Sequence, residues 1–130
     1  MKGNDEAVRT LLQRFAQAFT TGDGPGAAAC WEVPALVVAE DGSRAVATLD
    51  EVAAFFGGAT EQYTRQGVTG TRADVQHTEW YTPRLAAVRV RWPYLDAQGR
   101  DVGRAEESVY LVRLTGDAAK ICAVTMLGAT

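Results

Sequence analysis

The architecture of this chain is set by LAAVRVRWPYLDAQGRDVGRAEESVYLVRL, residues 85–114, in which two long strand-like segments flank a turn at residues 96–99. Before the turn, apolar and aromatic residues occupy every second position, which is the period of a β-strand with two distinct faces. These positions are Ala86, Val88, Val90, Trp92 and Tyr94. After the turn the same period continues to Leu114, but neither face is purely polar or purely apolar. A hairpin of this kind needs helices on one face and leaves the other face open to a partner.

The rest of the C-terminal half predicts the neighbouring strands of the same sheet. After Gly70 the strand-like segments are 71–81, 85–95, 102–114 and 118–127. They are divided by Thr82-Pro83, by residues 96–99 and by Thr115-Gly116-Asp117. Because connections this short join neighbouring strands in opposite directions, we expect a four-stranded antiparallel meander.

The first helix is predicted over residues 4–21. Apolar side chains recur there at intervals of three and four residues, from Val8 to Phe19, which is the spacing of one helix face. Asn4 can cap the N-terminus of this helix, and Gly22 offers the left-handed conformation that commonly ends one.

A short second helix and a hairpin follow. Asp23 is the natural cap of the second helix, which extends through Trp31 and ends before Pro34, because proline cannot occupy a helix interior. Asp41-Gly42 then indicates a tight turn between two short strands at 35–40 and 43–47.

The third helix begins at Thr48 and Glu51, which have the spacing of a capping box, and ends near Gly67. Gly57-Gly58 lies in its middle, where each glycine weakens a helix. Either the helix bends at this pair or another segment packs very close to its backbone.

Composition describes one domain and excludes several kinds of partner. With 130 residues, helices in the N-terminal half and an antiparallel sheet after them, the chain is predicted to form a single α+β domain over residues 1–130. The formal charge is −3 and no basic stripe exists, so nucleic acid is not an expected partner. There is no apolar run of about 18 residues, and the N-terminus turns acidic at once, so we expect no membrane span, no signal peptide and a cytoplasmic location.

The two cysteines offer no cofactor chemistry. Cys30 and Cys122 are far apart, and neither belongs to a CxxC motif or a Cys/His cluster. We expect both to be reduced, small, buried residues, because a disulfide would require an exported chain. No metal and no organic cofactor are predicted.

The order of these elements resembles the nuclear transport factor 2-like superfamily. The resemblance rests on FAQAFTTGD at 15–23, Trp31 with PALVV at 34–38, LAAVRVRW at 85–92, and YLVRL at 110–114 followed by Lys120-Ile121. It implies a cone-shaped α+β barrel in which a strongly curved sheet wraps around the first helix. Relatives with this fold include ketosteroid isomerase, scytalone dehydratase, limonene epoxide hydrolase and SnoaL-type polyketide cyclases, so the fold alone does not define a function.

The catalytic pattern of ketosteroid isomerase is mostly absent. That pattern needs an Asp base and an oxyanion hole made by a Tyr and a protonated Asp. The resemblance places these three positions at Ala39, Phe15 and Tyr110 of this chain. Phe15 has no hydroxyl and Ala39 has no carboxylate, so isomerisation by that mechanism is not expected.

In a cone of this type, one face of each long strand and the apolar faces of the helices would surround an interior. The residues expected to contact a ligand there are Phe15, Phe19, Trp31, Phe55, Val90, Trp92, Tyr94, Ser108, Tyr110 and Met126. Their mainly apolar character with a few polar groups is typical of a small-molecule site. The same residues could instead fill the core completely, and the sequence leaves both interpretations open.

Glu106, His77 and Tyr110 are the candidate catalytic residues. Glu106 could act as a general base, or it could be a solvated carboxylate paired with Arg91 or Arg104. His77 is the only histidine, and it could exchange protons or simply lie at the surface. The hydroxyl of Tyr110 could bond a ligand carbonyl or satisfy a backbone group.

The opposite sheet face predicts a homodimer. Val109 and Leu111 point away from the expected interior, together with Ala87 and Ala105, and exposed apolar patches usually mark partners. Two functions therefore remain open. The first is a dimeric, non-catalytic binding or interaction module with an apolar pocket. The alternative is a cofactor-independent isomerase, cyclase or hydratase that acts on a small apolar, polyketide-like or steroid-like substrate.

Overall fold

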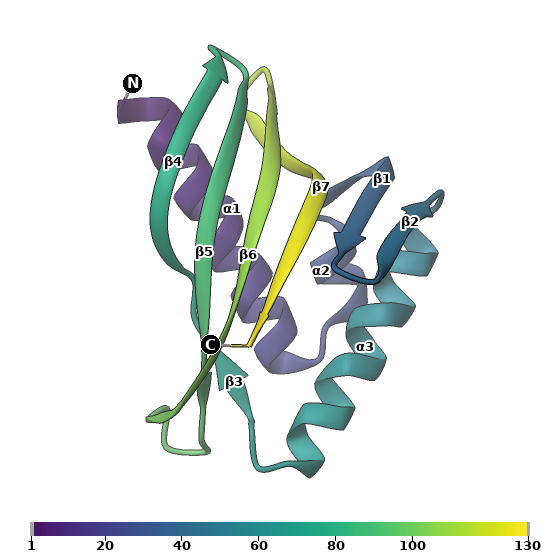
Figure 1. The fold of residues 1–130 in the computed structure, drawn as a ribbon, viewed down its shortest axis with the longest axis vertical. Coiled ribbons are helices and arrows are strands. Elements are labelled where there is room, and N and C mark those ends of the chain that lie inside the picture. Colours follow the sequence, from purple (N-terminus) through teal and green to yellow (C-terminus); the bar gives the residue numbers. More distant parts are fainter. Residues whose placement is uncertain (1, 130) are drawn as a thin grey trace.

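The structure, a computed structural model, describes residues 2–129 and has the expected α+β architecture (Figure 1). Within these residues, three helices pack on one side of a curved, unclosed sheet of seven strands. The helices are α1 (Lys2–Thr21), α2 (Gly24–Ala28) and α3 (Leu49–Arg65). The strands are β1 (Trp31–Ala39), β2 (Gly42–Val46), β3 (Gly70–Thr71), β4 (Asp74–Thr82), β5 (Leu85–Leu95), β6 (Asp101–Thr115) and β7 (Ala118–Ala129).

The strand order across the sheet is β2-β1-β7-β6-β5-β3, and β4 also pairs with β5. Strands β4 to β7 form the predicted antiparallel meander, which confirms the argument from connection length. The hairpin of β1 and β2 joins this meander through a parallel pairing of β1 with β7. The hairpin therefore extends the sheet beside α3 and gives the interior a further wall (Figure 1).

The segment predicted as one strand at 71–81 is divided into β3 and β4. Both pieces pair antiparallel with β5, Thr71 opposite Tyr94 and Asp74 opposite Arg91. The interruption lies across from Pro93, which has no N–H to donate to the ladder. The carbonyl of Pro93 instead accepts a hydrogen bond from the Thr71 hydroxyl at 2.8 Å.

The first helix begins earlier than predicted. Because α1 starts at Lys2, Asn4 lies inside the helix and is not its cap. The Asn4 side-chain amide donates to the carbonyl of Pro83, and Asp5 accepts a 2.7 Å bond from the indole of Trp80. These two contacts hold the first turns of α1 against the hairpin of β4 and β5.

The second helix is shorter than predicted. Asp23 does cap α2, accepting a bond from the Gly26 N–H at 2.9 Å. The helix nevertheless ends at Ala28, and Trp31 already belongs to β1, so the predicted extension through Trp31 is wrong. The reason is the parallel ladder, in which Trp31 pairs with Ile121 and the register then shifts before Leu36. Pro34 lies in this irregular stretch, where proline is tolerated in a strand.

The third helix confirms its predicted cap, because the Thr48 hydroxyl accepts a bond from the Glu51 N–H at 3.2 Å. It continues through Gly57 and Gly58 to Arg65. A methyl group added at either glycine would meet nothing within 4 Å, so the idea that another segment packs against this backbone is wrong.

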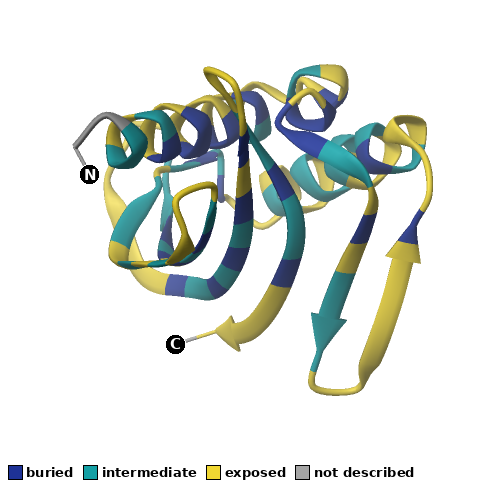
Figure 2. Ribbon diagram, turned by 90° about the horizontal axis from the view of Figure 1, so that it is seen from above, coloured by how far each residue is buried: buried dark blue, intermediate teal, exposed yellow. Residues whose placement is uncertain are grey.

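The closed core lies between α1 and the inner face of the sheet. Leu12, Val88, Val90, Val112 and Ile121 are completely buried. Burying a side chain of this size contributes about 1.5–3 kcal/mol to stability. Figure 2 shows the buried segments of the sheet facing the helices, whereas β2 is exposed along most of its length.

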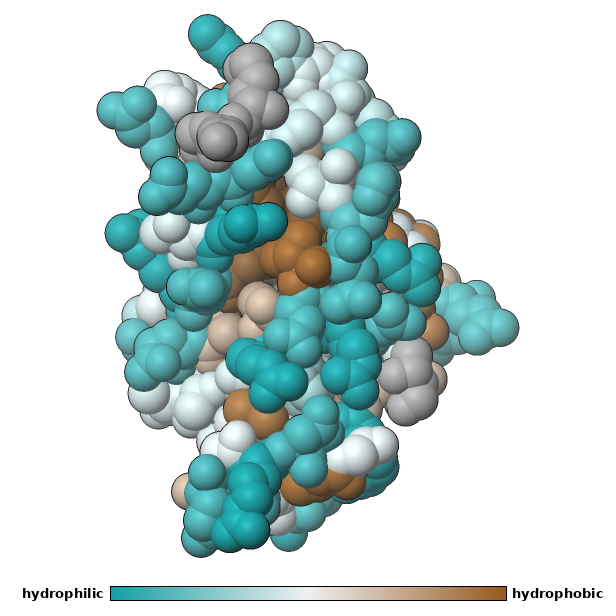
Figure 3. All heavy atoms as spheres, turned by 90° about the vertical axis from the view of Figure 1, so that its left-hand side faces the viewer, coloured by the Kyte–Doolittle hydropathy of each residue, from teal (hydrophilic) through white to brown (hydrophobic). Residues whose placement is uncertain are grey.

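The surface beside β4 is mostly hydrophilic, with hydrophobic areas near its centre and towards its lower end (Figure 3). Polar and charged side chains of this kind discourage pairing by an exposed edge strand. No helix within residues 2–129 has the length and hydropathy needed to cross a membrane.

Candidate ligand-binding cavity

A cavity of about 360 Å³ lies between α3, α1 and the inner face of the sheet. Every residue predicted to contact a ligand lines it, with the exception of Val90. The residues brought together are Phe15, Phe19, Trp31, Phe55, Trp92, Tyr94, Ser108, Tyr110 and Met126. Val90 is completely buried in the core and has no surface to offer a ligand. A space of about 360 Å³ remains among these side chains, and its use as a small-molecule site stays a prediction.

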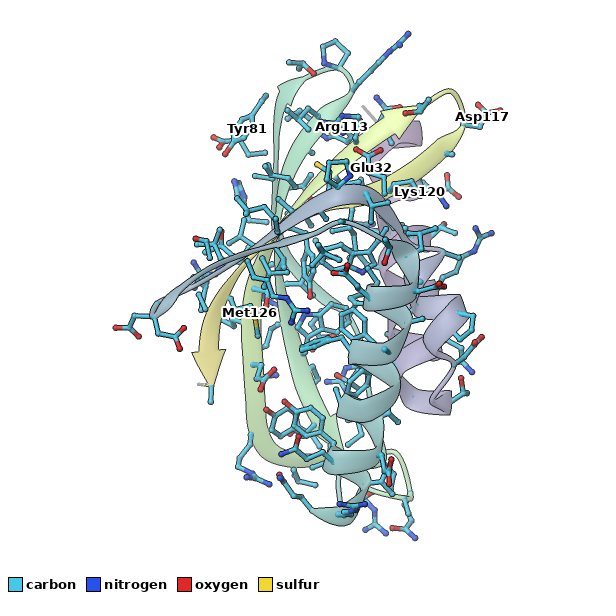
Figure 4. The ribbon with its side chains drawn as sticks, turned by 90° about the vertical axis from the view of Figure 1, so that its right-hand side faces the viewer. Glu32, Tyr81, Arg113, Asp117, Lys120 and Met126 are labelled. Atoms are coloured by element: carbon cyan, nitrogen blue, oxygen red, sulfur yellow. The ribbon has the colours of Figure 1, made fainter. Side chains whose placement is uncertain are left out.

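Aromatic rings form the inner wall of this cavity. Phe15, from α1, makes edge-to-face contacts with Phe56 at 4.9 Å and with Trp92 at 5.7 Å between ring centroids. Its contacts with Trp31 at 6.1 Å and Tyr110 at 6.2 Å have the same geometry. Such contacts restrain each ring beyond what simple burial does, so the wall has a defined shape. Figure 4 shows this gathering of rings between α3 and the sheet.

A carboxylate cluster occupies one part of the cavity wall. The hydroxyls of Tyr63 and Tyr94 both donate to Oε1 of Glu106, at 2.8 Å and 2.6 Å. The two phenol rings lie 5.4 Å apart. Burial raises the pKa of Tyr63 and of Tyr94, and the bond to Glu106 raises both pKa values further. Both phenols therefore keep their protons and act as donors to the carboxylate.

The alternative that Glu106 pairs with an arginine is wrong. The Nη1 atom of Arg91 lies 3.9 Å from Oδ2 of Asp101. The guanidinium of Arg104 lies over the ring of Tyr94, 5.6 Å from its centroid. The partners of Glu106 are tyrosines because β5 and α3 bring both hydroxyls to the same half-buried carboxylate.

Tyr63 is a member of this site that the sequence did not identify as functional. It shares the apolar stripe of α3 with Phe56 and lies seven residues further along the helix. Its hydroxyl is the feature that could have indicated the site, since a tyrosine on a buried stripe usually finds a hydrogen-bond partner.

A second group of polar side chains surrounds the Tyr110 hydroxyl. Tyr110 is only 6% exposed and Ser108 only 7% exposed, and both line the cavity. Ser108 lies two residues before Tyr110 on β6, and the ring of Trp92 meets the ring of Tyr110 edge to face at 5.9 Å. Burial raises the pKa of Tyr110 well above its ordinary value, and these two neighbours lower it by less. Tyr110 is therefore a neutral phenol at physiological pH.

The entrance of the cavity combines exposed apolar and charged residues. Phe55 on α3 is 54% exposed and Met126 on β7 is 40% exposed, although both line the cavity. Arg44 on β2 and Glu51 on α3 add charge to the same lining. Figure 4 shows Met126 on the strand that faces this space.

His77 is not brought to the cavity. It lies on β4, where it is exposed and pairs across the sheet with Arg89. The structure thus places Glu106 and Tyr110 together at the cavity and separates His77 from both. Within residues 2–129, no group of three His, Cys, Asp or Glu side chains could hold a metal ion, and Cys30 and Cys122 are free thiols.

Residues 5–129 match the model of a family described as NTF2-like protein (DUF6841), so the chain belongs to this NTF2-like family. The family assignment confirms the resemblance seen in the sequence. No curated protein matches the sequence.

Solved structures share the fold at low sequence identity. A cystatin-like domain of unknown function from Nostoc punctiforme is 21% identical and has a TM-score of 0.74, with 97% of this chain and 77% of that chain covered. An NTF2-like protein of unknown function from Shewanella oneidensis is 14% identical, with a TM-score of 0.71 and coverage of 95% and 98%. A ketosteroid isomerase-like protein from Erwinia carotovora is 15% identical, with a TM-score of 0.62 and 95% of each chain covered. At these identities the likeness concerns the fold alone.

Proposed function

We propose that this protein binds a small, mainly apolar molecule in the cavity between α3 and the sheet. The observation that supports this proposal is the open space of about 360 Å³ behind a wall of aromatic rings. This volume lies within the usual range for small-molecule sites, about 300–1,000 Å³, and near its lower end. The ligand is therefore compact, and burial of its apolar surface supplies most of its affinity.

We favour binding without catalysis. The carboxylate in the cavity wall is Glu106, and one of its oxygens already accepts bonds from two phenols. Two of the three positions that carry the catalytic groups of ketosteroid isomerase hold Phe15 and Ala39, which lack the required functional groups.

Catalysis without a cofactor is the second candidate function. Glu106 and Tyr110 line the same cavity, so a proton acceptor and a hydrogen-bond donor face one space. The structural likeness to a ketosteroid isomerase-like protein fits this candidate. Turnover of a bound compound that is lost in Glu106→Gln, with binding retained, would establish it.

Filling the cavity tests the binding proposal. Ala59 lines the cavity on α3, whereas Ala54 lies on the exposed face of the same helix. Native mass spectrometry of freshly purified protein would show whether a small molecule is retained, and the same spectrum reports the oligomer. We expect Ala59→Phe to abolish the retained mass and Ala54→Phe to keep it. A wild-type protein that retains nothing, and that binds no compact apolar compound in calorimetric titrations, would refute the proposal.

We also propose that the convex sheet face forms a homodimer. Sheet pairing places Ala87, Leu111, Ala123 and Leu36 in one row that runs from β5 to β1. Val109 lies in the adjacent row, and Leu36 is 44% exposed. Ala105, which was expected on this surface, is fully buried and is not part of it. A mostly apolar row across four strands is the kind of surface that a second copy can cover.

The cytoplasm remains the proposed location. Fractionation of cells that express the chain with a C-terminal tag would test it.

A further inference from the structure

Glu106 brings to the cavity wall a carboxylate with one oxygen still available. The hydroxyls of Tyr63 and Tyr94 both donate to its Oε1 atom, at 2.8 Å and 2.6 Å, whereas Oε2 has no hydrogen-bond partner within residues 2–129. Glu106 is half-buried, and Oε2 is not among the fully enclosed polar atoms that lack a partner, so this oxygen keeps some open surface. Because Glu106 lines the cavity, Oε2 can accept a bond from a molecule bound there.

Glu106 has no cation as a partner among the described residues. The ion pairs of residues 2–129 join other side chains, and none includes this carboxylate. Across the sheet Glu106 pairs with Trp92 on β5 and with Ala129 on β7, and neither is charged. Arg104, two residues earlier on β6, is exposed and lies over the ring of Tyr94. A half-buried negative charge without a paired cation is unfavourable, so an incoming cation would be stabilised beside it.

Aromatic rings lie next to this carboxylate. Trp92 is its direct partner on β5, so the two side chains leave the sheet on the same face with Cβ atoms about 5 Å apart. The rings of Tyr63 and Tyr94, whose hydroxyls contact Glu106, lie 5.4 Å from each other. The faces of such rings attract cations, and the guanidinium of Arg104 already lies 5.6 Å from the centroid of Tyr94. The rings therefore favour the same sign of charge as the carboxylate does.

The other charged groups that line the cavity do not change this sign. Arg44 on β2 and Glu51 on α3 have opposite charges, and both are exposed, so solvent screens them. The tyrosines that line the cavity have raised pKa values and stay neutral. An organic cation suits this lining better than a metal ion, which needs several ligands. Within residues 2–129, no three His, Cys, Asp or Glu side chains are grouped to supply them.

We propose that Glu106 recognises a protonated amine, so the ligand of the cavity is a compact organic ammonium ion with an apolar body. An ammonium group has hydrogen-bond donors and no acceptor, so it can donate to Oε2 and does not compete for the two phenol protons. The apolar body lies against the rings of Phe15 and Phe56, which line the same space. The proposal rests on the proposed binding function and adds the chemical class of the ligand to it.

Four probes with one two-ring skeleton test the proposal. They are indane, a hydrocarbon; 2-indanol, an alcohol; 2-aminoindane, an amine that is protonated at neutral pH; and indane-2-carboxylate, an anion. Isothermal titration calorimetry with the whole protein at neutral pH would give the four affinities. A hydrogen bond to a charged group corresponds to about tenfold in affinity or more, so we expect the amine to bind about tenfold tighter than the alcohol. The anion should bind most weakly.

Variants then assign the preference to Glu106. Glu106→Gln keeps the shape and an oxygen that can accept from the phenols but removes the charge, so the amine should lose about tenfold in affinity while the alcohol keeps its affinity. The matched control is Glu79→Gln, the same change on an exposed residue of β4, which should leave the preference intact. Glu51→Gln removes the carboxylate at the entrance, and it should weaken the amine less than Glu106→Gln does.

A measurement on the wild type covers the case in which Glu106→Gln folds poorly. The proton on C2 of 2-aminoindane is next to the nitrogen, so nuclear Overhauser contacts between it and the ring of Trp92 would locate the ammonium group beside Glu106. Contacts of this proton only with residues at the entrance, such as Phe55, would contradict the proposal.

The outcomes separate this proposal from the one on which it rests. If none of the probes binds, both proposals fail. If the amine and the alcohol bind equally, or Glu106→Gln weakens both alike, Glu106 does not recognise an amine but the binding function stands. An anion that binds more tightly than the amine would overturn the choice of a cation. A larger loss in Glu51→Gln than in Glu106→Gln would overturn the assignment to Glu106.

Discussion

Removing the hydroxyl of Tyr63 tests whether α3 is joined to the sheet through Glu106. In Tyr63→Phe the 2.8 Å bond to Oε1 of Glu106 is lost, while the ring contacts with Phe19 at 5.7 Å and Tyr94 at 5.4 Å can remain. A hydrogen bond to a charged group contributes about 1.5–3 kcal/mol to stability. Because Tyr63 and Glu106 are only partly buried, we expect a loss at the lower end, about 1.5 kcal/mol.

This loss is large enough to measure by thermal unfolding. The unfolding entropy of about 2.1 cal/mol/K per residue gives about 0.27 kcal/mol/K for a chain of 130 residues. A loss of about 1.5 kcal/mol therefore lowers Tm by about 5 °C. Urea unfolding followed by circular dichroism gives the free energy independently, and the slope with denaturant should not change.

A double-mutant cycle with Tyr94 makes the test specific. Glu106 keeps one phenol partner in either single variant but none when both tyrosines become phenylalanine. The double variant should therefore lose more than the sum of the single losses, since a partly buried carboxylate is left unpaired. Tyr81→Phe, a change on the exposed surface, should stay within about 0.5 kcal/mol of wild type. If Tyr63→Phe is equally stable, the link between α3 and Glu106 does not exist in solution.

Two other predictions concern pH and assembly. Burial raises the pKa of Tyr110 above its usual 10.0, so above pH 10 the folded protein retains a proton that the unfolded chain loses. The free energy of unfolding should fall above about pH 10, by about 1.4 kcal/mol per pH unit for this residue. Urea unfolding at several pH values should show a shallower fall for Tyr110→Phe than for the wild type. Equal dependence of the free energy on pH in the two proteins would contradict the buried phenol. Leu111→Glu places a charge in the convex row and should shift sedimentation from dimer towards monomer, whereas Thr115→Glu, at the exposed end of the same strand, should not. A wild-type monomer at high concentration would reject the dimer.

Local patterns in the sequence determined much of the fold. The alternation before residues 96–99 and the short turns around it predicted the meander, because strand period and hairpin length depend on neighbouring residues. The caps at Asp23 and Thr48 were predicted for the same reason, since each side chain bonds an N–H three residues away. The end of the second helix was not predicted correctly, because Trp31 enters a strand by pairing with Ile121, which lies 90 residues further along the chain.

The site depended on contacts between distant parts of the chain. Val90 and Trp92 share one strand face, and the sequence cannot distinguish them, yet Val90 is enclosed in the core and Trp92 borders the cavity. Glu106 was identified from its place on the strand, but its partner Tyr63 is 43 residues away, on a helix whose path across the sheet no local pattern defines. The sequence by itself determined most of the elements and most of the residues that face inwards, although Ala105 was expected outside and is buried. Only the tertiary structure decided where packing closes the interior, where it leaves about 360 Å³ open, and which polar groups meet there, because those depend on how whole elements lie across one another.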